Sequence, residues 1–343
     1  AGPGDTDERP FIDAIVRGGG LTPHTIDGND LGFDADDLAR IVRQQEEPFW
    51  YAFLLVLWRL YALAQAQGVR VLLDGVDGDA VVASCGSAYL RELVRAGDWR
   101  AFAAQVDGAA RQRSGDHLGY ARYWAGRLRD SVAEPLLLAP ARQGWMRLTR
   151  TPPLLAPYIA PALAERTGLV ARLARHANGE PVASPTVRQC HYWSLTQSAF
   201  PYHLEMLNRA AAAFGLEYRH PFFDKRLVEF SLAIPATQRY DRGETRGVLR
   251  RALAGLLPDT IYWRPGKGVV SHHYLRSALT TGAPSCGERI LAAPACDAAY
   301  LAPATLHRMW QEFMPPYNKG NINSLWYTAA VTFWLHEWIG HPA

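Results

Sequence analysis

Apolar residues recur at helical spacing along most of this chain, and one short run reads as a strand. The spacing predicts helices over residues 7–17 and 34–46, and a long apolar helix that opens after Pro48 and covers residues 49–64. The next apolar run, Val69 to Leu73, is typical of a strand buried on both faces. An Asp- and Gly-rich loop follows directly, and open α/β sheets bind ligands at the carboxyl ends of their strands.

The pattern after about Tyr89 is helical nearly to the end of the chain. Helices are predicted over residues 90–95, 99–111, 118–128, 203–214, 225–233, 245–256 and 326–339. The Pro-rich stretch 135–161 reads as a linker or irregular segment. We therefore predict an α/β fold that contributes part of a parallel sheet, followed by a mainly helical remainder.

Composition narrows the class of protein. The chain has 343 residues, 48% of them apolar and 20% charged, which is ordinary for a globular protein. The net charge of +3 is scattered, so no nucleic-acid partner is expected. Four widely spaced cysteines and no signal-peptide pattern predict a cytoplasmic protein with reduced thiols. The apolar stretch 49–64 is interrupted by Arg59 and is shorter than the ~20 residues of a membrane span, so no membrane is expected.

The loop after the predicted strand is the first candidate for chemistry. It reads Asp-Gly-Val-Asp-Gly-Asp over residues 74–79. Carboxylates on a bendable glycine-rich turn suit a hard cation such as Mg2+ beside a phosphate. The alternative is a solvated turn, which commonly has this composition.

Two further segments carry dense polar groups. Glu205 and Arg209 lie four residues apart on one helix face, where a plain surface ion pair is the alternative to function. The run 217–224 (EYRHPFFD) sets acids, an Arg and a His among aromatics. A basic helix start at residues 243–246 leads to Arg264-Pro-Gly-Lys267-Gly, a candidate phosphate or oxyanion clamp whose alternative is a solvated basic turn.

The order of these segments resembles the asparagine-synthetase superfamily, which includes asparagine synthetase, β-lactam-forming synthetases and lasso-peptide cyclases. The segments in order are GVDGD (75–79), Glu205, GLEYRHPFFD (215–224), TRGVLRRAL (245–253), LLP (256–258) and RPGKG (264–268), and the likeness covers roughly residues 7–270. The loop with Ser84, followed by YLRELVRAGDW, is most similar to lasso-peptide isopeptide-forming cyclases. The resemblance implies an adenine-nucleotide alpha-hydrolase (ATP pyrophosphatase) fold, with a partial α/β domain over residues 1–110 and a mainly helical part over 111–343.

The resemblance also implies roles for individual residues. It assigns ATP contacts to Gly75, Asp77, Gly78, Asp79, Arg264 and Lys267. Asp79 is expected to bind Mg2+ with pyrophosphate, and Lys267 to stabilise the oxyanion formed when the amine attacks. Glu205 falls where β-lactam synthetases hold a glutamate that helps to deprotonate the amine. Val76 stands where relatives carry its Glu or Tyr partner, so Asp77 is a second candidate for part of that role.

The family's Ser-Gly-Gly-x-Asp-Ser phosphate loop and its glutaminase-like amino-terminal domain are not found in this sequence. The likeness begins just after the strand that carries that loop. We therefore expect an amino-terminal half of the enzyme as a partner. Without it, the apolar faces around Leu72, Leu73 and residues 49–63 are expected to be partly uncovered.

The activity that the resemblance implies is ATP-dependent macrolactam formation in a precursor peptide, with a leader peptidase as a further partner. An Asp or Glu side chain of the peptide is adenylated, and the peptide's N-terminal amine closes the ring. One alternative is an asparagine synthetase that uses glutamine or ammonia. Another is a catalytically inactive peptide-binding relative, which Val76 and the missing phosphate loop both suggest.

Overall fold

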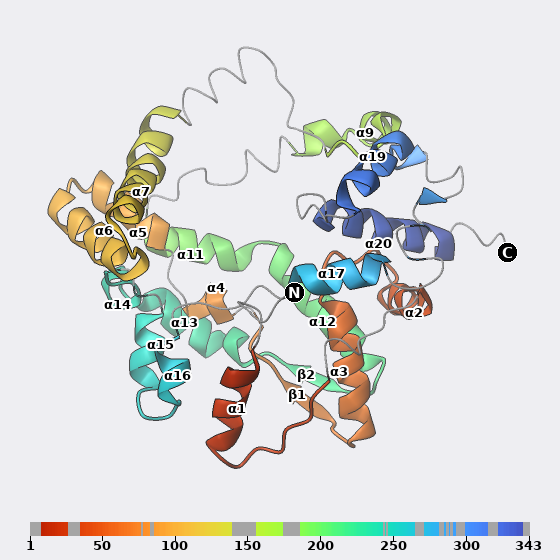
Figure 1. Cartoon of the computed structure of the whole chain (residues 1–343), viewed down its shortest axis with the longest axis horizontal. Coiled ribbons are helices and arrows are strands. Elements are labelled where there is room, and N and C mark those ends of the chain that lie inside the picture. Colours follow the sequence, from red (N-terminus) through yellow and green to blue (C-terminus); the bar gives the residue numbers. More distant parts are fainter. Residues whose placement is uncertain are drawn as a thin grey trace.

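The computed structural model describes most of the chain as helices around one small sheet. It describes residues 8–26, 35–76, 78–82, 86–138, 156–173, 186–242, 244, 246–264, 271–280, 285, 288, 291–292, 299–314 and 322–338. Over these residues the sheet has two parallel strands, β1 (Val71–Leu73) and β2 (Glu217–Arg219). Figure 1 shows α5, α6 and α7 gathered on one side of the molecule and α9, α19 and α20 on the other.

The first part of the chain largely follows its hydrophobic pattern. The structure has α1 (Arg9–Arg17), α2 (Ala35–Gln45), α3 (Leu54–Ala66) and α4 (Gly78–Val82). The predictions for α1 and α2 are confirmed. The long apolar helix begins at Leu54 rather than at residue 49, so that boundary was wrong. The backbone before it is held by long-range contacts, because the Tyr202 hydroxyl donates to the Pro48 carbonyl and the Trp326 indole to the Trp50 carbonyl.

The remaining elements are almost all helices. They are α5 (Gly86–Arg95), α6 (Trp99–Arg113), α7 (His117–Leu128), η1 (Arg129–Leu138), α9 (Pro161–Arg166), α11 (Val187–Thr196), α12 (Ala199–Ala212), η2 (Pro221–Phe223), α13 (Lys225–Ala233), α14 (Ala236–Arg239), α15 (Gly247–Ala252), α16 (Asp259–Tyr262), α17 (Ser271–Thr280), α19 (Pro303–Phe313) and α20 (Ile322–Trp338). The mainly helical character of the remainder is therefore confirmed, although α9, α11, α17 and α19 were not among the predicted helices. In addition η1, a π-helix continuing α7, extends into the start of the predicted Pro-rich linker.

The sheet joins segments that lie far apart in sequence. Val71 pairs with Glu217 and Leu73 with Arg219, and the Asp74 amide continues the ladder by donating to the Arg219 carbonyl. Parallel pairing brings both carboxyl ends, and the loops after them, to the same edge. The strands come from either side of the predicted boundary at residue 110, so both parts of the chain build the sheet.

The expectation that the first strand is buried on both faces was wrong. Val71 is 41% exposed and Leu73 is 69% exposed, while Leu72 is half-buried. Among the described residues β1 pairs with β2 alone, so no second strand lies along its other edge and helps to bury it. The expected uncovering of this region is confirmed at Leu73, and Leu60 of α3 is likewise exposed.

Two apolar clusters hold the helices together. The larger joins α2, α3 and α12 to α17, α19 and α20, and includes the edge-to-face pair of Phe49 and Trp326. The smaller lies under α5 and α6, around Leu90, Phe102 and Tyr240. None of the described helices is long and apolar enough to cross a bilayer.

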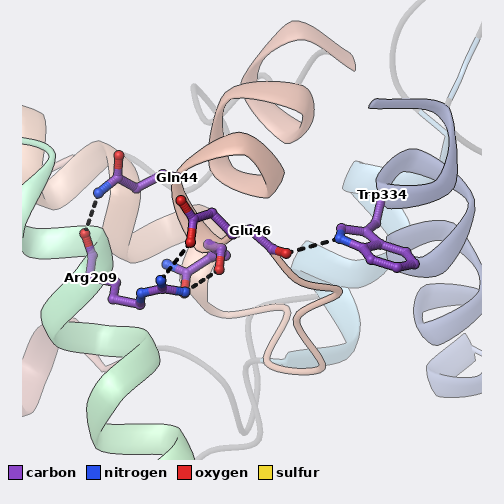
Figure 2. Close-up of polar contacts among 5 residues, drawn as sticks. Gln44, Glu46, Arg209 and Trp334 are labelled. Atoms are coloured by element: carbon purple, nitrogen blue, oxygen red, sulfur yellow. Dashed lines mark hydrogen bonds and ion pairs between the residues drawn. The ribbon is translucent and has the colours of Figure 1, made fainter. Parts of the chain in front are cut away.

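A polar junction fixes α12 against the turn after α2. Glu46 has a left-handed backbone (φ 60°), which costs energy for a residue with a side chain. Figure 2 shows its neighbours: Arg209 Nη2 donates to Glu46 Oε2 at 2.9 Å, and Trp334 Nε1 donates to the Glu46 carbonyl at 3.0 Å. Gln44 Nε2 in turn donates to the Arg209 carbonyl at 2.9 Å. Arg209 thus pairs with Glu46, and the Glu205–Arg209 surface pair considered from the sequence is not formed.

Candidate functional site

Asp74 ties together the carboxyl ends of both strands. One of its carboxylate oxygens accepts the backbone N–H of Val76, and the other accepts the hydroxyl of Tyr218 in β2. Nδ1 of His220, just after β2, lies 4.0 Å from the first of these oxygens. Asp74 is therefore engaged in shaping the loop, which distinguishes it from the exposed carboxylate farther along.

The two glycines of the loop pack against the turn after β2. A Cβ on Gly78 would lie 2.9–3.0 Å from ring atoms of Phe222, closer than real Cβ contacts come, whereas one on Gly75 would lie 3.8 Å away. Position 78 therefore requires glycine because of close approach rather than backbone conformation. This contact joins the first and second sequence segments, and it seats α4 on η2.

Asp79, in the first turn of α4, meets the third segment. Arg246 Nε donates to Asp79 Oδ1 at 2.8 Å, and Nη2 contacts the same oxygen. Both side chains remain accessible, with exposed fractions of 43% for Asp79 and 36% for Arg246. Arg246 has a left-handed backbone (φ 62°) directly before α15. A carboxylate and a guanidinium are thus held together beside the carboxyl end of the sheet.

Glu205 lies on the exposed side of α12, one turn before Asn208. Asn208 Nδ2 lies 3.2 Å from Nε2 of His220, which places α12 alongside the end of β2. Burial, together with the carboxylates of Glu47 and Glu205, raises the pKa of Tyr202 to about 12. The structure therefore puts Glu205 near the loops at this edge, with its role in proton transfer still a prediction.

Arg264 is engaged by the first helix. Its Nη1 and Nη2 donate to the two carboxylate oxygens of Glu8, each at 2.6 Å, and its guanidinium lies 3.9 Å from the centre of the Phe11 ring. Arg250 donates to the Arg264 carbonyl at 3.0 Å. These contacts fix the start of the predicted clamp. Asp77 and Lys267 lie outside the described residues, so their assignments stay predictions, as does the ATP contact of Arg264.

An open pocket of about 540 Å³ adjoins the loop. Its walls come from α3, β1 and the segment before α3, and the loop residues Asp74, Gly75 and Val76 also line it. His203 of α12 lines it as well, packed edge-to-face on Tyr51 with ring centres 4.5 Å apart. The pocket is therefore mainly apolar, with polar groups where it meets the loop.

The next question is whether the residues of the candidate site could bind Mg2+. The described residues contain no group of three His, Cys, Asp or Glu side chains that could hold a metal ion. Mg2+ is, however, commonly bound by one or two carboxylates while substrate phosphates and water complete its shell. The accessible Asp79 carboxylate fits such a shared site, and Arg246 beside it suits the phosphates. Asp79 and Arg246 therefore fit a Mg2+ ion that arrives bound to phosphate.

The contact of Arg246 with Asp79 was not predicted from the sequence, where Arg246 was noted only as part of a basic helix start. Its position two residues after Glu244 gave no indication that it meets Asp79, because the contact spans 167 residues. Phe222 was noted only as part of an aromatic run. The glycine at position 78 is the sequence feature that could have indicated close packing there.

Two comparisons place the chain among known proteins. A family model described as asparagine synthase matches residues 2–339. Asparagine synthetase [glutamine-hydrolyzing] 3 of Bacillus subtilis (strain 168) is 35% identical over 91 residues, which are 25% of this chain. The matched stretch covers only 14% of that relative's length.

Proposed function

This chain belongs to the asparagine synthase family, whose members are ATP-dependent amide-forming ligases, and we propose that it forms an isopeptide bond within a precursor peptide. The proposal rests on the family match together with the loop sequence DGVDGD, its Ser84 and the YLRELVRAGDW segment, which are most similar to lasso-peptide cyclases. The product is a macrolactam between the peptide's N-terminus and an Asp or Glu side chain.

The observation that supports this activity best is the pairing of Asp79 with Arg246 beside the carboxyl end of β1. Phosphoryl and adenylyl transfer depends on positioned charge at the phosphates. Arg246 would bind phosphate oxygens, and Asp79 would hold the Mg2+ that accompanies them. When bound, that ion neutralises negative charge on the phosphates.

The proposed reaction has two steps. An oxygen of the substrate carboxylate attacks the α-phosphorus of ATP, and the bond to pyrophosphate breaks to give an acyl-adenylate. The nitrogen of the peptide's N-terminal amine then attacks the acyl carbon, the bond to the AMP oxygen breaks, and the amine proton passes to a base. The chain's main contribution is to hold amine and acyl carbon in reach of each other.

Proton transfer and charge stabilisation in the second step fall to groups on three segments. We propose Glu205 as the base, with Asp77 sharing this role because Val76 cannot take a proton. Lys267 would stabilise the oxyanion. The exposed position of Glu205 on α12 leaves it accessible to an approaching amine.

We propose in addition that the amino-terminal half of the enzyme docks on the edge of β1 that pairs with no other described strand. Arg70 and Asp74 bond to β2, so the alternate residues Val71 and Leu73 direct their backbone groups to the other side. That edge adjoins the apolar pocket under α3. An extended segment with apolar side chains would satisfy the edge and cover Leu73, and so continue the sheet.

An asparagine synthetase is the second candidate, since the relative from Bacillus subtilis carries that name. In that case ammonia replaces the peptide amine as the nucleophile and free aspartate replaces the peptide carboxylate. A different product distinguishes the two activities.

The test is mass spectrometry of reactions that contain the chain, its amino-terminal half, Mg·ATP, a leader peptidase and a precursor peptide with one candidate carboxylate. The proposal predicts a peptide that has lost one water and resists aminopeptidase. A peptide whose candidate Asp or Glu is replaced by the corresponding amide is the control and should stay linear. Formation of asparagine from aspartate and ammonia, with a linear peptide, would favour the second candidate.

A further inference from the structure

His191 of α11 is fully buried and lies directly behind the candidate site. Its exposed fraction is 0%, and Nε2 lies 2.8 Å from the carbonyl of Ala80, the residue after Asp79. Its Nδ1 lies 2.5 Å from Nη1 of Arg239, which is itself only 3% exposed. A buried histidine and a buried arginine therefore meet one residue away from the exposed carboxylate of the site.

The partners fix the protonation of this histidine. A guanidinium only donates hydrogen bonds, so Nδ1 must accept, and a carbonyl only accepts, so Nε2 must carry the proton. His191 is thus neutral and in one tautomer, bridging Arg239 to the backbone of α4. Burial, followed by the charge of Arg239, lowers the pKa of His191 and so favours this neutral form.

Arg239 ends α14, and α14 also backs the start of α15. Arg251 Nη2 donates to the Gln238 carbonyl at 2.8 Å. A Cβ on Gly247 would lie 3.0 Å from that same carbonyl oxygen, so α15 and α14 approach each other closely here. Gly247 directly follows Arg246. The contacts therefore close a ring from Asp79 through Arg246, α15, α14, Arg239 and His191 back to Ala80.

We infer that His191 and Arg239 are positioning residues which set α4, and with it the Asp79 carboxylate, against Arg246. Their importance for catalysis rests on the proposed function, whereas their effect on the position of α4 does not. Hydrogen bonds that satisfy a buried polar pair hold their partners rigidly, and a half-satisfied pair is costly. Neither residue reaches the exposed side of the site, so both act through the backbone of α4 and the start of α15.

The test compares backbone hydrogen exchange in residues 78–82 among variants of the 343-residue chain. His191→Phe keeps the ring volume and loses both hydrogen bonds, whereas His191→Gln keeps one donor and one acceptor. Thr328→Val, at a buried polar site in α20, is the matched control. We expect exchange in α4 to be roughly tenfold faster in His191→Phe, close to wild type in His191→Gln, and unchanged in Thr328→Val.

A urea titration of each variant separates local from global loss of stability. Unaltered exchange in α4 of folded His191→Phe would overturn the inference, as would equal acceleration in Thr328→Val. The rate of pyrophosphate release in the assembled enzyme gives the second readout, and it should fall in His191→Phe and recover in His191→Gln. Faster exchange in α4 with an unaltered rate would support the positioning and contradict the proposed role of Asp79 instead.

Discussion

Arg246 and Asp79 are two accessible charged side chains that pair beside the carboxyl end of β1. Their exposure makes the pair a weak contributor to stability, since surface ion pairs contribute little. We propose instead that the pair serves to bind phosphate and its metal ion. Arg246 also holds a left-handed backbone, a cost that residues at functional sites commonly bear.

We predict that Asp79→Ala and Arg246→Ala each lower the rate of pyrophosphate release by at least roughly 10²-fold, because each removes charge that stabilises the transition state. Urea titrations should show little change in stability. Arg43→Ala is the matched control, since it breaks an exposed ion pair with Glu337 away from the sheet. A rate close to wild type in Asp79→Ala at saturating Mg2+ would refute the site assignment.

His191 gives a pH dependence whose sign follows from its lowered pKa. In the unfolded chain the imidazole takes up a proton near pH 6.5, whereas the folded chain keeps it neutral to lower pH. The unfolded state then binds more protons, so the free energy of unfolding falls as pH drops below about 6.5. We predict that His191→Gln has a shallower loss of stability between pH 6.5 and 5, measured by urea titration. An identical pH slope in the variant would contradict this.

At the scale of elements, α4 depends on its contact with the turn after β2. Gly78→Ala would force a methyl group into the Phe222 ring, and we predict a loss of about 1–3 kcal/mol in the free energy of unfolding. Gly75→Ala is the matched control for stability, because its methyl group would make an ordinary contact with the same ring. Equal stability of the two variants would show that α4 is not seated on Phe222.

The helices were predictable from sequence where apolar residues recur at helical spacing, as in α1, α2 and α13. Other elements were not predicted individually, among them β2, α9, α11, α17 and α19. The strand β2 is only three residues long and lies inside a run of charged and aromatic residues, so its short alternation of exposed and buried positions was not recognised as a strand. The start of α3 was misplaced because Trp326 and Tyr202, distant in sequence, bond to carbonyls that a helix would have used.

The candidate site was predictable residue by residue only in part. Asp79 and the glycines stood out because their Asp- and Gly-rich loop directly follows the predicted strand, at the edge where open α/β sheets bind ligands. Arg246 and His191 did not stand out, since their contacts with α4 cross more than a hundred residues of chain. Arg239 did not stand out either, because it bonds to His191 from another helix. Local sequence patterns carry no information about such pairings.

At the scale of the whole molecule, we make one prediction about nucleotide binding. It follows from the apolar surface beside β1 and from the distribution of phosphate-binding groups. Most N–H donors for a triphosphate come from a phosphate loop, and we expect that loop on the amino-terminal half that we propose docks beside β1. The 343-residue chain alone should therefore bind Mg·ATP weakly in calorimetry, with tighter binding after the upstream segment is added. Tight stoichiometric binding by the chain alone would contradict the proposed docking.

We propose that this family member adenylates a carboxylate with the help of Asp79. The most direct measurement is the identity of the nucleotide released when the chain, its amino-terminal half, Mg·ATP and the precursor peptide are mixed, followed by chromatography and phosphorus NMR. We expect AMP and pyrophosphate, whose formation depends on the peptide carboxylate and is lost in Asp79→Ala. Release of ADP and phosphate, or AMP formation that persists in Asp79→Ala, would contradict it.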